Sequence, residues 1–250
     1  MELRPAIAAP PPTSAAARPV VAAGSRVSQV IELASLVVAS IGLTLLVVRL
    51  GPAVGFAWWL PIVVLAAGVA ADLMSGVVHW IADTWGHESW PVIGPRLLRP
   101  FRVHHVNPDD MLGRGFLDLN GDVALLTMPL LATAWLLPTE SRAGLIAATF
   151  VTAWAAWALP TNQVHQWAHM VNPPRAVRWL QRVRFILPAD AHRVHHASPY
   201  ATHYCITTGW NNPWTARIGF FTGLERIVTR LTGLVPRADE WTVTVHEAPR

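Results

Sequence analysis

The chain has 250 residues, of which 52% are hydrophobic and only 14% are charged, and its mean hydropathy is +0.35. A soluble domain carries about 25% charged residues, so this composition favours a membrane protein of one or two domains. The formal net charge is +4, but all 19 basic residues are arginines scattered along the chain. Because no nucleic-acid-binding module accompanies them, we expect no nucleic-acid partner.

The first 29 residues are rich in Pro, Ala and Ser, with the run APPPTSAAARP at their centre. Such a segment cannot bury a core, so residues 1–29 are expected to be a disordered tail. The apolar segment that follows is too long for a cleaved signal peptide, and no small-residue cleavage pattern comes after it. Residues 240–250 are expected to form a second, C-terminal tail.

Four apolar stretches follow the first tail, and each is a candidate membrane helix. They cover residues 31–50, 54–71, 123–137 and 143–159. A helix needs about 20 residues to cross the hydrocarbon core. The first, second and fourth stretches reach that length with their flanks, whereas the third is shorter and contains Pro129. The sequence therefore predicts an all-α polytopic membrane protein with about four transmembrane helices.

The arginines predict how these helices are oriented. Four spans place both termini and the long connection of residues 83–122 on the same side of the membrane. The two short connections on the other side hold only Arg49 and Arg142, so the remaining 17 arginines lie on the first side. The positive-inside rule makes that side cytoplasmic.

The histidines follow the same division, because the topology puts four separate histidine groups on the cytoplasmic side. These residues are His79, His104, His105, His165, His169, His192, His195 and His196. The pairs 165/169 and 192/196 have i, i+4 spacing, which places two side chains on one face of a helix. Eight imidazoles suffice for two metal ions, so we expect a histidine-rich metal-binding cap. Imidazole suits iron, zinc and copper, and spacing does not choose among them.

Six further residues need separate interpretation. Asp83 lies four residues after His79 and is expected either to bind metal directly or to orient an imidazole. His87 lies in a polar loop and is expected to be solvated. His203 is a possible extra ligand, and His246 is assigned no role. Nearby, Arg99 and Arg102 are expected to be positive-inside residues rather than a lipid phosphate site.

Six motifs carrying these residues resemble a known family. They are ADLMSGVVHWIADTWG, RPFRVHHVNP, NGD, TNQVHQWAHM, HRVHHASP and YCITTGWNNP. In this order and with these gaps, from Ala71 to Asp239, they resemble the plasmanylethanolamine desaturases among the membrane lipid desaturases. The resemblance implies a membrane lipid desaturase domain over residues 30–239.

The resemblance also implies a reaction, namely formation of a cis double bond beside the ether oxygen of a 1-O-alkyl phospholipid. It implies two iron ions held by the eight histidines, with Asp83 at the family's acidic position. Dioxygen would be the co-substrate, and a small protein resembling cytochrome b5 or ferredoxin would supply electrons. The partners would thus be an ether phospholipid, membrane lipid and this donor protein, and no substrate-binding residue can be assigned.

Other functions remain open at this point. A lipid hydroxylase would use the same ligands, a zinc hydrolase would need no oxygen, and a membrane sensor would need no metal. The absence of Lys and the abundance of Ala and Arg suggest a GC-rich genome. We therefore expect a bacterial inner membrane, with both termini cytoplasmic, or the endoplasmic reticulum if the source is eukaryotic.

Overall fold

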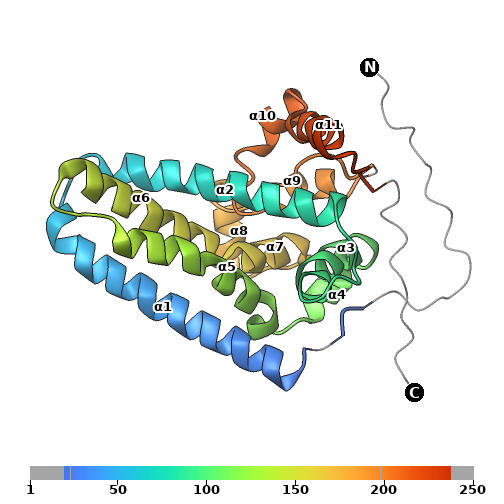
Figure 1. The fold of residues 1–250 in the computed structure, drawn as a ribbon, viewed down its shortest axis with the longest axis horizontal. Coiled ribbons are helices and arrows are strands. Elements are labelled where there is room, and N and C mark those ends of the chain that lie inside the picture. Colours follow the sequence, from blue (N-terminus) through green and yellow to red (C-terminus); the bar gives the residue numbers. More distant parts are fainter. Residues whose placement is uncertain (1–19, 23, 198, 238–250) are drawn as a thin grey trace, which may run out of the picture.

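The computed structural model of this protein describes residues 20–22, 24–197 and 199–237 (Figure 1). The regular elements of this described part are all helices. Residues 1–19 of the predicted N-terminal tail and the predicted tail 240–250 lie outside it. The first helix begins at Arg26, where the Ser25 side chain caps it by accepting a hydrogen bond from the Ser28 backbone N–H.

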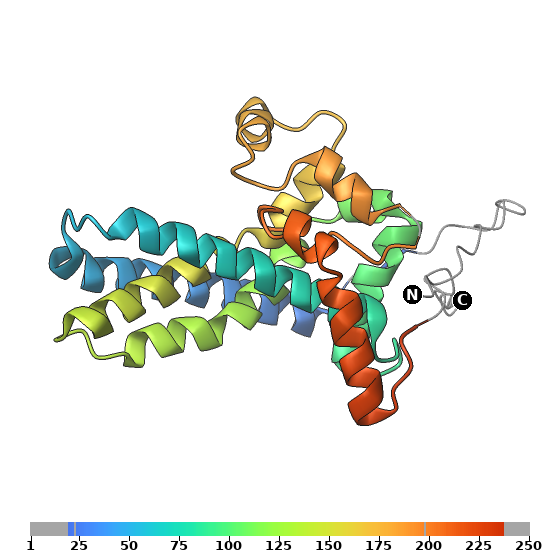
Figure 2. The ribbon, with the colours of Figure 1, turned by 90° about the horizontal axis from the view of Figure 1, so that it is seen from above.

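Four long helices lie side by side in an elongated bundle (Figures 1 and 2). They are α1 (Arg26–Val54), α2 (Leu60–Thr84), α5 (Phe116–Leu136) and α6 (Arg142–Ala158), the last continued by α7 (Thr161–His169). Each is long and apolar enough to cross a membrane when α6 and α7 are taken as one span. The prediction of four transmembrane helices is therefore confirmed, and the chain is an integral membrane protein.

The second span is displaced from its predicted position. Gly55 ends α1 with a φ of 50°, and α2 begins at Leu60, with Pro61 in its first turn. Pro is favoured there because its missing N–H would have had no helical partner. The helix then continues thirteen residues beyond Ala71 to Thr84. Hydropathy missed this extension because its residues are more polar, although they stay helical.

The third span begins earlier than predicted, at Phe116 instead of residue 123, so the NGD motif is helical. Pro129 lies inside this helix without ending it. The connection between α2 and α5 is also more ordered than a loop. It contains the short elements η1 (Gly94–Leu98), α3 (Arg99–Val106) and α4 (Pro108–Gly113).

Small side chains make up much of the interior of the bundle, together with Leu46 and Leu131. Ala39, Ala124, Ala134, Ala148 and Ala155 are fully buried where α1, α5 and α6 meet. Small residues let membrane helices approach closely. Large apolar side chains point outward instead, including Val37, Val48 and Leu65. This inverted pattern is expected for helices surrounded by lipid.

The remaining elements gather with α7 at one end of the bundle (Figures 1 and 2). They are η1, α3, α4, α8 (Arg175–Arg182), α9 (Ala189–His195), α10 (Asn212–Arg217) and α11 (Phe220–Thr232). The short α1–α2 and α5–α6 connections lie at the opposite end. The fold therefore has a bundle and a cap, and all the predicted histidine groups lie where the two meet.

Candidate metal centre

Helices from four parts of the chain bring the eight predicted histidines together. His79 is on α2, His104 and His105 are on α3, and His165 and His169 are on α7; the last group is on α9 and its C-terminal cap, at positions 192, 195 and 196. Five of the eight side chains are almost inaccessible to solvent: His79, His104, His165, His192 and His195. Their nitrogens form two adjoining groups in which every ligand atom lies within 4.8 Å of the others.

The first group contains His104, His165, His169, His192 and His196 and is called the His192 group here. The Nε2 atom of His192 lies 2.8 Å from that of His165, 2.8 Å from that of His169 and 3.1 Å from that of His196. The Nε2 atoms of His165 and His169 are 3.4 Å apart. Each i, i+4 pair, on α7 and at the end of α9, thus shares one face as its spacing predicted, and the structure brings the two pairs together.

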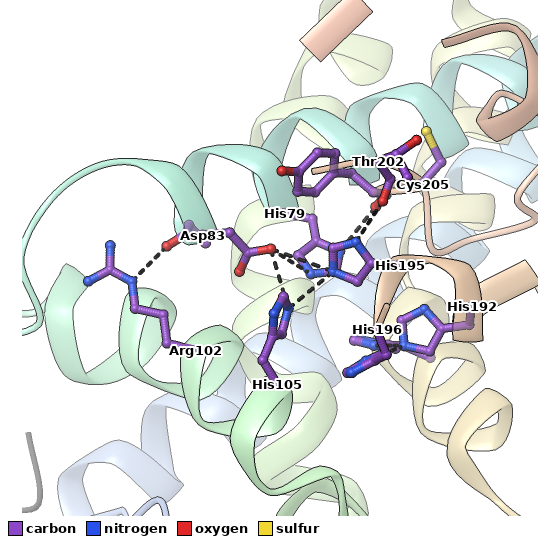
Figure 3. A network of polar contacts seen from close by, with 12 residues as sticks. His79, Asp83, Arg102, His105, His192, His195, His196, Thr202 and Cys205 are labelled. Atoms are coloured by element: carbon purple, nitrogen blue, oxygen red, sulfur yellow. Dashed lines mark hydrogen bonds and ion pairs between the residues drawn. The ribbon is translucent and has the colours of Figure 1, made fainter. Parts of the chain in front are cut away.

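The second group contains His79, His104, His105 and His195. The Asp83 carboxylate lies beside three of them, so the group is called the Asp83 group (Figure 3). Oδ2 of Asp83 lies 3.2, 3.4 and 3.6 Å from the Nε2 atoms of His79, His105 and His195, respectively. The Nε2 atoms of His105 and His195 are 3.1 Å apart. Nitrogens of His104 belong to both groups, so this side chain lies between them.

Backbone carbonyls determine which nitrogen of two imidazoles carries the hydrogen. His79 Nδ1 lies 3.1 Å from the Tyr204 carbonyl oxygen, and His195 Nδ1 lies 2.8 Å from that of Thr202. A carbonyl oxygen can only accept, so each Nδ1 donates. In the neutral imidazoles, Nε2 then presents a lone pair, and both lone pairs face the Asp83 carboxylate. In metal sites, carbonyl groups that accept a hydrogen bond from the other ring nitrogen orient ligating histidines in this way.

A cation between the Asp83 oxygens and the imidazole nitrogens would satisfy these converging lone pairs. Both Asp83 oxygens, His79 Nε2 and both ring nitrogens of His104 are buried without a hydrogen-bond partner among the described residues. A buried polar atom without a partner costs about 1–3 kcal/mol. Two nitrogens bound at about 2.1 Å to one ion are about 3.0–3.4 Å apart for adjacent octahedral or tetrahedral positions. The observed spacings lie close to that range, so the residues present fit a metal in each group.

Burial also keeps imidazoles in the state that binds metal. Desolvation lowers the pKa of His104, His105, His192 and His195 well below the usual histidine value, and that of His196 to about 3. The neighbouring imidazoles lower these pKa values further. The five side chains are therefore neutral at physiological pH, and neutral imidazole is the ligand form.

The other residues considered from sequence lie outside both groups. His87 is exposed beside Ser89, as expected of a solvated side chain. His203 is half-buried and near the Thr202 hydroxyl, and it belongs to neither group. His246 lies outside the described residues. Arg102 is buried, and donates to the Ala82 and Trp85 carbonyls at the end of α2. It therefore binds the α2 terminus, a role that the sequence did not suggest.

Sequence reasoning also missed Asp72, a fully buried residue within α2. Its carboxylate accepts hydrogen bonds from the backbone N–H groups of Thr208, Gly209 and Asn211, and from the Asn211 side chain. These contacts hold residues 204–212 against the bundle, and the Tyr204 carbonyl of this segment orients His79. An ionisable residue within a membrane span is a signal of function that could have identified Asp72.

Comparisons with known proteins agree with these observations. The lipid desaturase domain family matches residues 68–239. A plasmanylethanolamine desaturase of Myxococcus xanthus is 44% identical over 73% of this chain and 65% of its own length. Plasmanylethanolamine desaturase 1 of Mus musculus is 42% identical over 71% of the chain and 68% of its own length. The chloroplastic fatty acid desaturase 4 of Arabidopsis thaliana is 33% identical over 69% of the chain and 53% of its own length. No solved structure matches.

Proposed function

The chain belongs to the lipid desaturase family, and we propose that it is a plasmanylethanolamine desaturase that uses dioxygen to form the vinyl ether of a plasmalogen. Two relatives that carry this name share 42–44% of aligned residues with it. The alignments span about two thirds of those relatives. The observation that carries the proposal is the convergence of eight imidazoles and one carboxylate in two adjoining groups.

We propose that each group holds one iron ion. The His192 group would supply four imidazoles to one ion, the Asp83 group would supply three imidazoles and a carboxylate oxygen to the other, and His104 lies between them. Oxygen and nitrogen ligands of this kind suit iron. When bound, such a centre supplies the dioxygen chemistry that removes two hydrogens from neighbouring carbons, with electrons from a cytochrome b5-like or ferredoxin-like protein.

The chain's own residues orient the imidazoles, contribute a carboxylate and place an apolar side chain beside the centre. The carbonyls of Thr202 and Tyr204 fix two imidazoles before metal binds, so little reorganisation is needed. Asp83 contributes a negative charge to a site otherwise made of neutral ligands. Phe101 packs against His79, with 4.8 Å between ring centroids, and presents an apolar ring on that side of the centre. Exclusion of water protects reactive species from side reactions.

We also propose that the cap faces the cytoplasm. Arg49 and Arg142 are the arginines in or next to the two short connections opposite the cap, and each lies over a tryptophan ring. Most other arginines of the described residues are in the cap or at the helix ends that adjoin it. This asymmetry follows the positive-inside rule. A bacterial inner membrane would then place the metal centre beside cytoplasmic electron donors.

Expression in a host that lacks vinyl-ether lipids tests the proposed reaction. The host is fed an alkylglycerol, and its ether lipids are analysed by mass spectrometry before and after mild acid. We expect lipids that have lost two hydrogens and are cleaved by acid, and we expect none from a folded His169→Ala variant. A gain of one oxygen would instead identify a hydroxylase. Unchanged lipids, or full activity of the variant, would contradict the proposal.

A further inference from the structure

A cavity of about 600 Å³ opens between α1, α2, α5 and α6, beside the metal centre. Sites for small ligands have volumes of about 300–1,000 Å³. Most of the wall is apolar, with Met74 and Val78 from α2, Leu126 and Leu130 from α5, and Trp154 from α6. A wall of this kind, within a bundle of membrane helices, suits a hydrocarbon chain.

The cavity reaches the histidine groups at the cap. Phe101 lines it, and the Phe101 ring lies 4.8 Å from the His79 ring and 6.1 Å from the His104 ring. Val78, the neighbour of His79, also lines the wall, as does Thr161, one helical turn before His165. A chain in the cavity would therefore pass next to both groups.

The same cavity has a strongly polar part. Ser28 and Glu32 of α1, Arg96 of η1 and Asp122 of α5 all line it. The Arg96 guanidinium donates to the Ser28 hydroxyl and to Asp122, and lies 3.8 Å from Glu32. Glu32 accepts a hydrogen bond from the Ser28 hydroxyl, and only 6% of its side chain is exposed.

A buried carboxylate on a membrane helix is costly unless it has a function or a partner. The chain accommodates it through Gly121, the middle residue of the NGD motif. A Cβ atom at Gly121 would lie 2.3 Å from the Glu32 Cβ and 2.7 Å from its Cα. Glycine at this position thus allows α1 and α5 to approach closely at the place where the Glu32 carboxylate lines the cavity.

The charges of this polar part indicate a zwitterionic ligand. Beside Arg96, the wall contains Arg114, which binds Asp118 through two hydrogen bonds. Three carboxylates, Glu32, Asp118 and Asp122, therefore accompany two guanidinium groups. The formal balance of one negative charge favours a ligand with a cationic group. Arginine is at the same time well suited to a phosphate.

We propose that this cavity binds the 1-O-alkyl phospholipid and recognises its head group. This inference rests on the proposed function. The alkyl chain lies along the apolar wall, the ethanolamine ammonium is bound by Glu32 and Asp122, and the phosphate is bound by Arg96. Each carboxylate can accept hydrogen bonds from a primary ammonium, which has three donors. A quaternary ammonium has no such donor, so the same carboxylates discriminate against choline.

The position of the polar part fits the position of the reacting carbons. These carbons are the first two of the alkyl chain, directly beside the glycerol and its head group. The head group must therefore bind at the same end of the bundle as the metal centre. Glu32 lies near the start of α1, and that end of α1 lies towards the cap (Figure 1). A lipid whose head group lay at the opposite end of the bundle would place carbons far from the ether oxygen beside the metal centre.

The test compares two lipids that differ only in the head group, a plasmanylethanolamine and the matched plasmanylcholine. Purified enzyme in proteoliposomes, supplied with ferredoxin and its reductase, is assayed for vinyl-ether formation. We expect the wild type to prefer the ethanolamine lipid. Glu32→Gln should lower kcat/KM for that lipid about tenfold or more and change the value for the choline lipid by less than about twofold. The ratio of the two kcat/KM values, ethanolamine lipid over choline lipid, should therefore be smaller in this variant than in the wild type.

Two further variants make the comparison decisive. Glu140→Gln removes an exposed carboxylate from the connection at the opposite end of the bundle and should leave both values unchanged. If Glu32→Gln fails to fold, Asp122→Asn replaces it, because that side chain is 28% exposed and its loss is better tolerated. An unchanged head-group preference in a folded Glu32→Gln or Asp122→Asn variant would overturn the inference. Absence of vinyl-ether lipid from the wild type with either substrate would instead overturn the proposed function.

Discussion

Two aspartates on the same helix, Asp72 and Asp83, are both removed from solvent and have opposite surroundings. Asp72 accepts four hydrogen bonds of 2.7–3.0 Å from residues 208–211. Neither oxygen of Asp83 has a hydrogen bond of good geometry, and three imidazole nitrogens surround its Oδ2 within 3.2–3.6 Å. One carboxylate is satisfied by the protein, whereas the other is not.

Burial alone therefore does not identify a functional carboxylate. What separates the two is the kind of atom that each one faces. Asp72 faces N–H donors, which complete its hydrogen bonding and make it an anchor. Asp83 faces the Nε2 atoms of His79 and His195. In the neutral imidazoles these atoms present lone pairs, an arrangement that repels unless a proton or a metal ion lies between them. The anchor also serves the metal centre, because the segment it holds includes the Tyr204 carbonyl that orients His79.

The largest effect is expected from Asp83→Asn, which keeps the shape of the side chain and removes its charge. Loss of one ligand should lower the metal content of the enzyme and reduce vinyl-ether formation by about 100-fold or more. The fold should persist, because no hydrogen bond of the described residues depends on this carboxylate. Metal analysis and product assays check this, and a variant with wild-type values in both would remove Asp83 from the site.

A change at Asp72 should act on stability instead. Asp72→Ala leaves three backbone N–H groups without an acceptor, two of them buried and one partly buried, and each buried group costs about 1–3 kcal/mol. We expect a loss of about 3 kcal/mol or more, seen as a clearly lower Tm of the metal-free protein in detergent. Asp83→Ala should not lower the Tm of the metal-free protein, because it removes a buried carboxyl group whose oxygens have no hydrogen-bond partner among the described residues. Equal decreases in Tm for Asp72→Ala and Asp83→Ala would contradict the distinction between the two aspartates.

Metal removal should sharpen the same distinction. A ligand that binds only the folded protein stabilises it, so the metal-loaded protein should have a higher Tm than the chelator-treated protein. The difference should be smaller in Asp83→Asn, which has lost one ligand. It should persist in His87→Ala, since His87 is exposed and outside both groups. Differential scanning fluorimetry with and without chelator measures the change, and a Tm independent of metal would argue against a metal-bearing core.

The smallest effect is expected from Gly76→Ala, between the two aspartates on α2. A Cβ there would lie 2.5 Å from the Cys205 Sγ atom and 3.2 Å from the Cys205 backbone nitrogen. Overpacking of this kind costs about 1–3 kcal/mol. The displaced segment should also weaken metal binding through Tyr204. Gly113→Ala is the matched control, because a Cβ there meets nothing within 4 Å. It should change neither the free energy of unfolding nor metal binding.

The sequence predicted the four spans because apolar runs of membrane length are a strong signal. It predicted the eight histidines because the topology places their four groups on one side of the membrane and two of these groups have i, i+4 spacing. It could not place the ends of α2 and α5, whose polar turns carry His79, Asp83 and the NGD motif. The partners of Asp72 could not be predicted either, because they lie 136–139 residues away in the sequence. Such contacts depend on how helices meet, and no local pattern encodes that.

The central claim is that lone pairs of the two histidine groups and of Asp83 converge on two metal ions. The most direct measurement is the iron content of the purified wild-type chain, expressed in iron-replete medium and compared with Asp83→Asn. We predict about two iron ions per chain in the wild type and a clear loss in the variant. A folded, active wild-type enzyme with no iron, or with the same iron content in both proteins, would contradict this account.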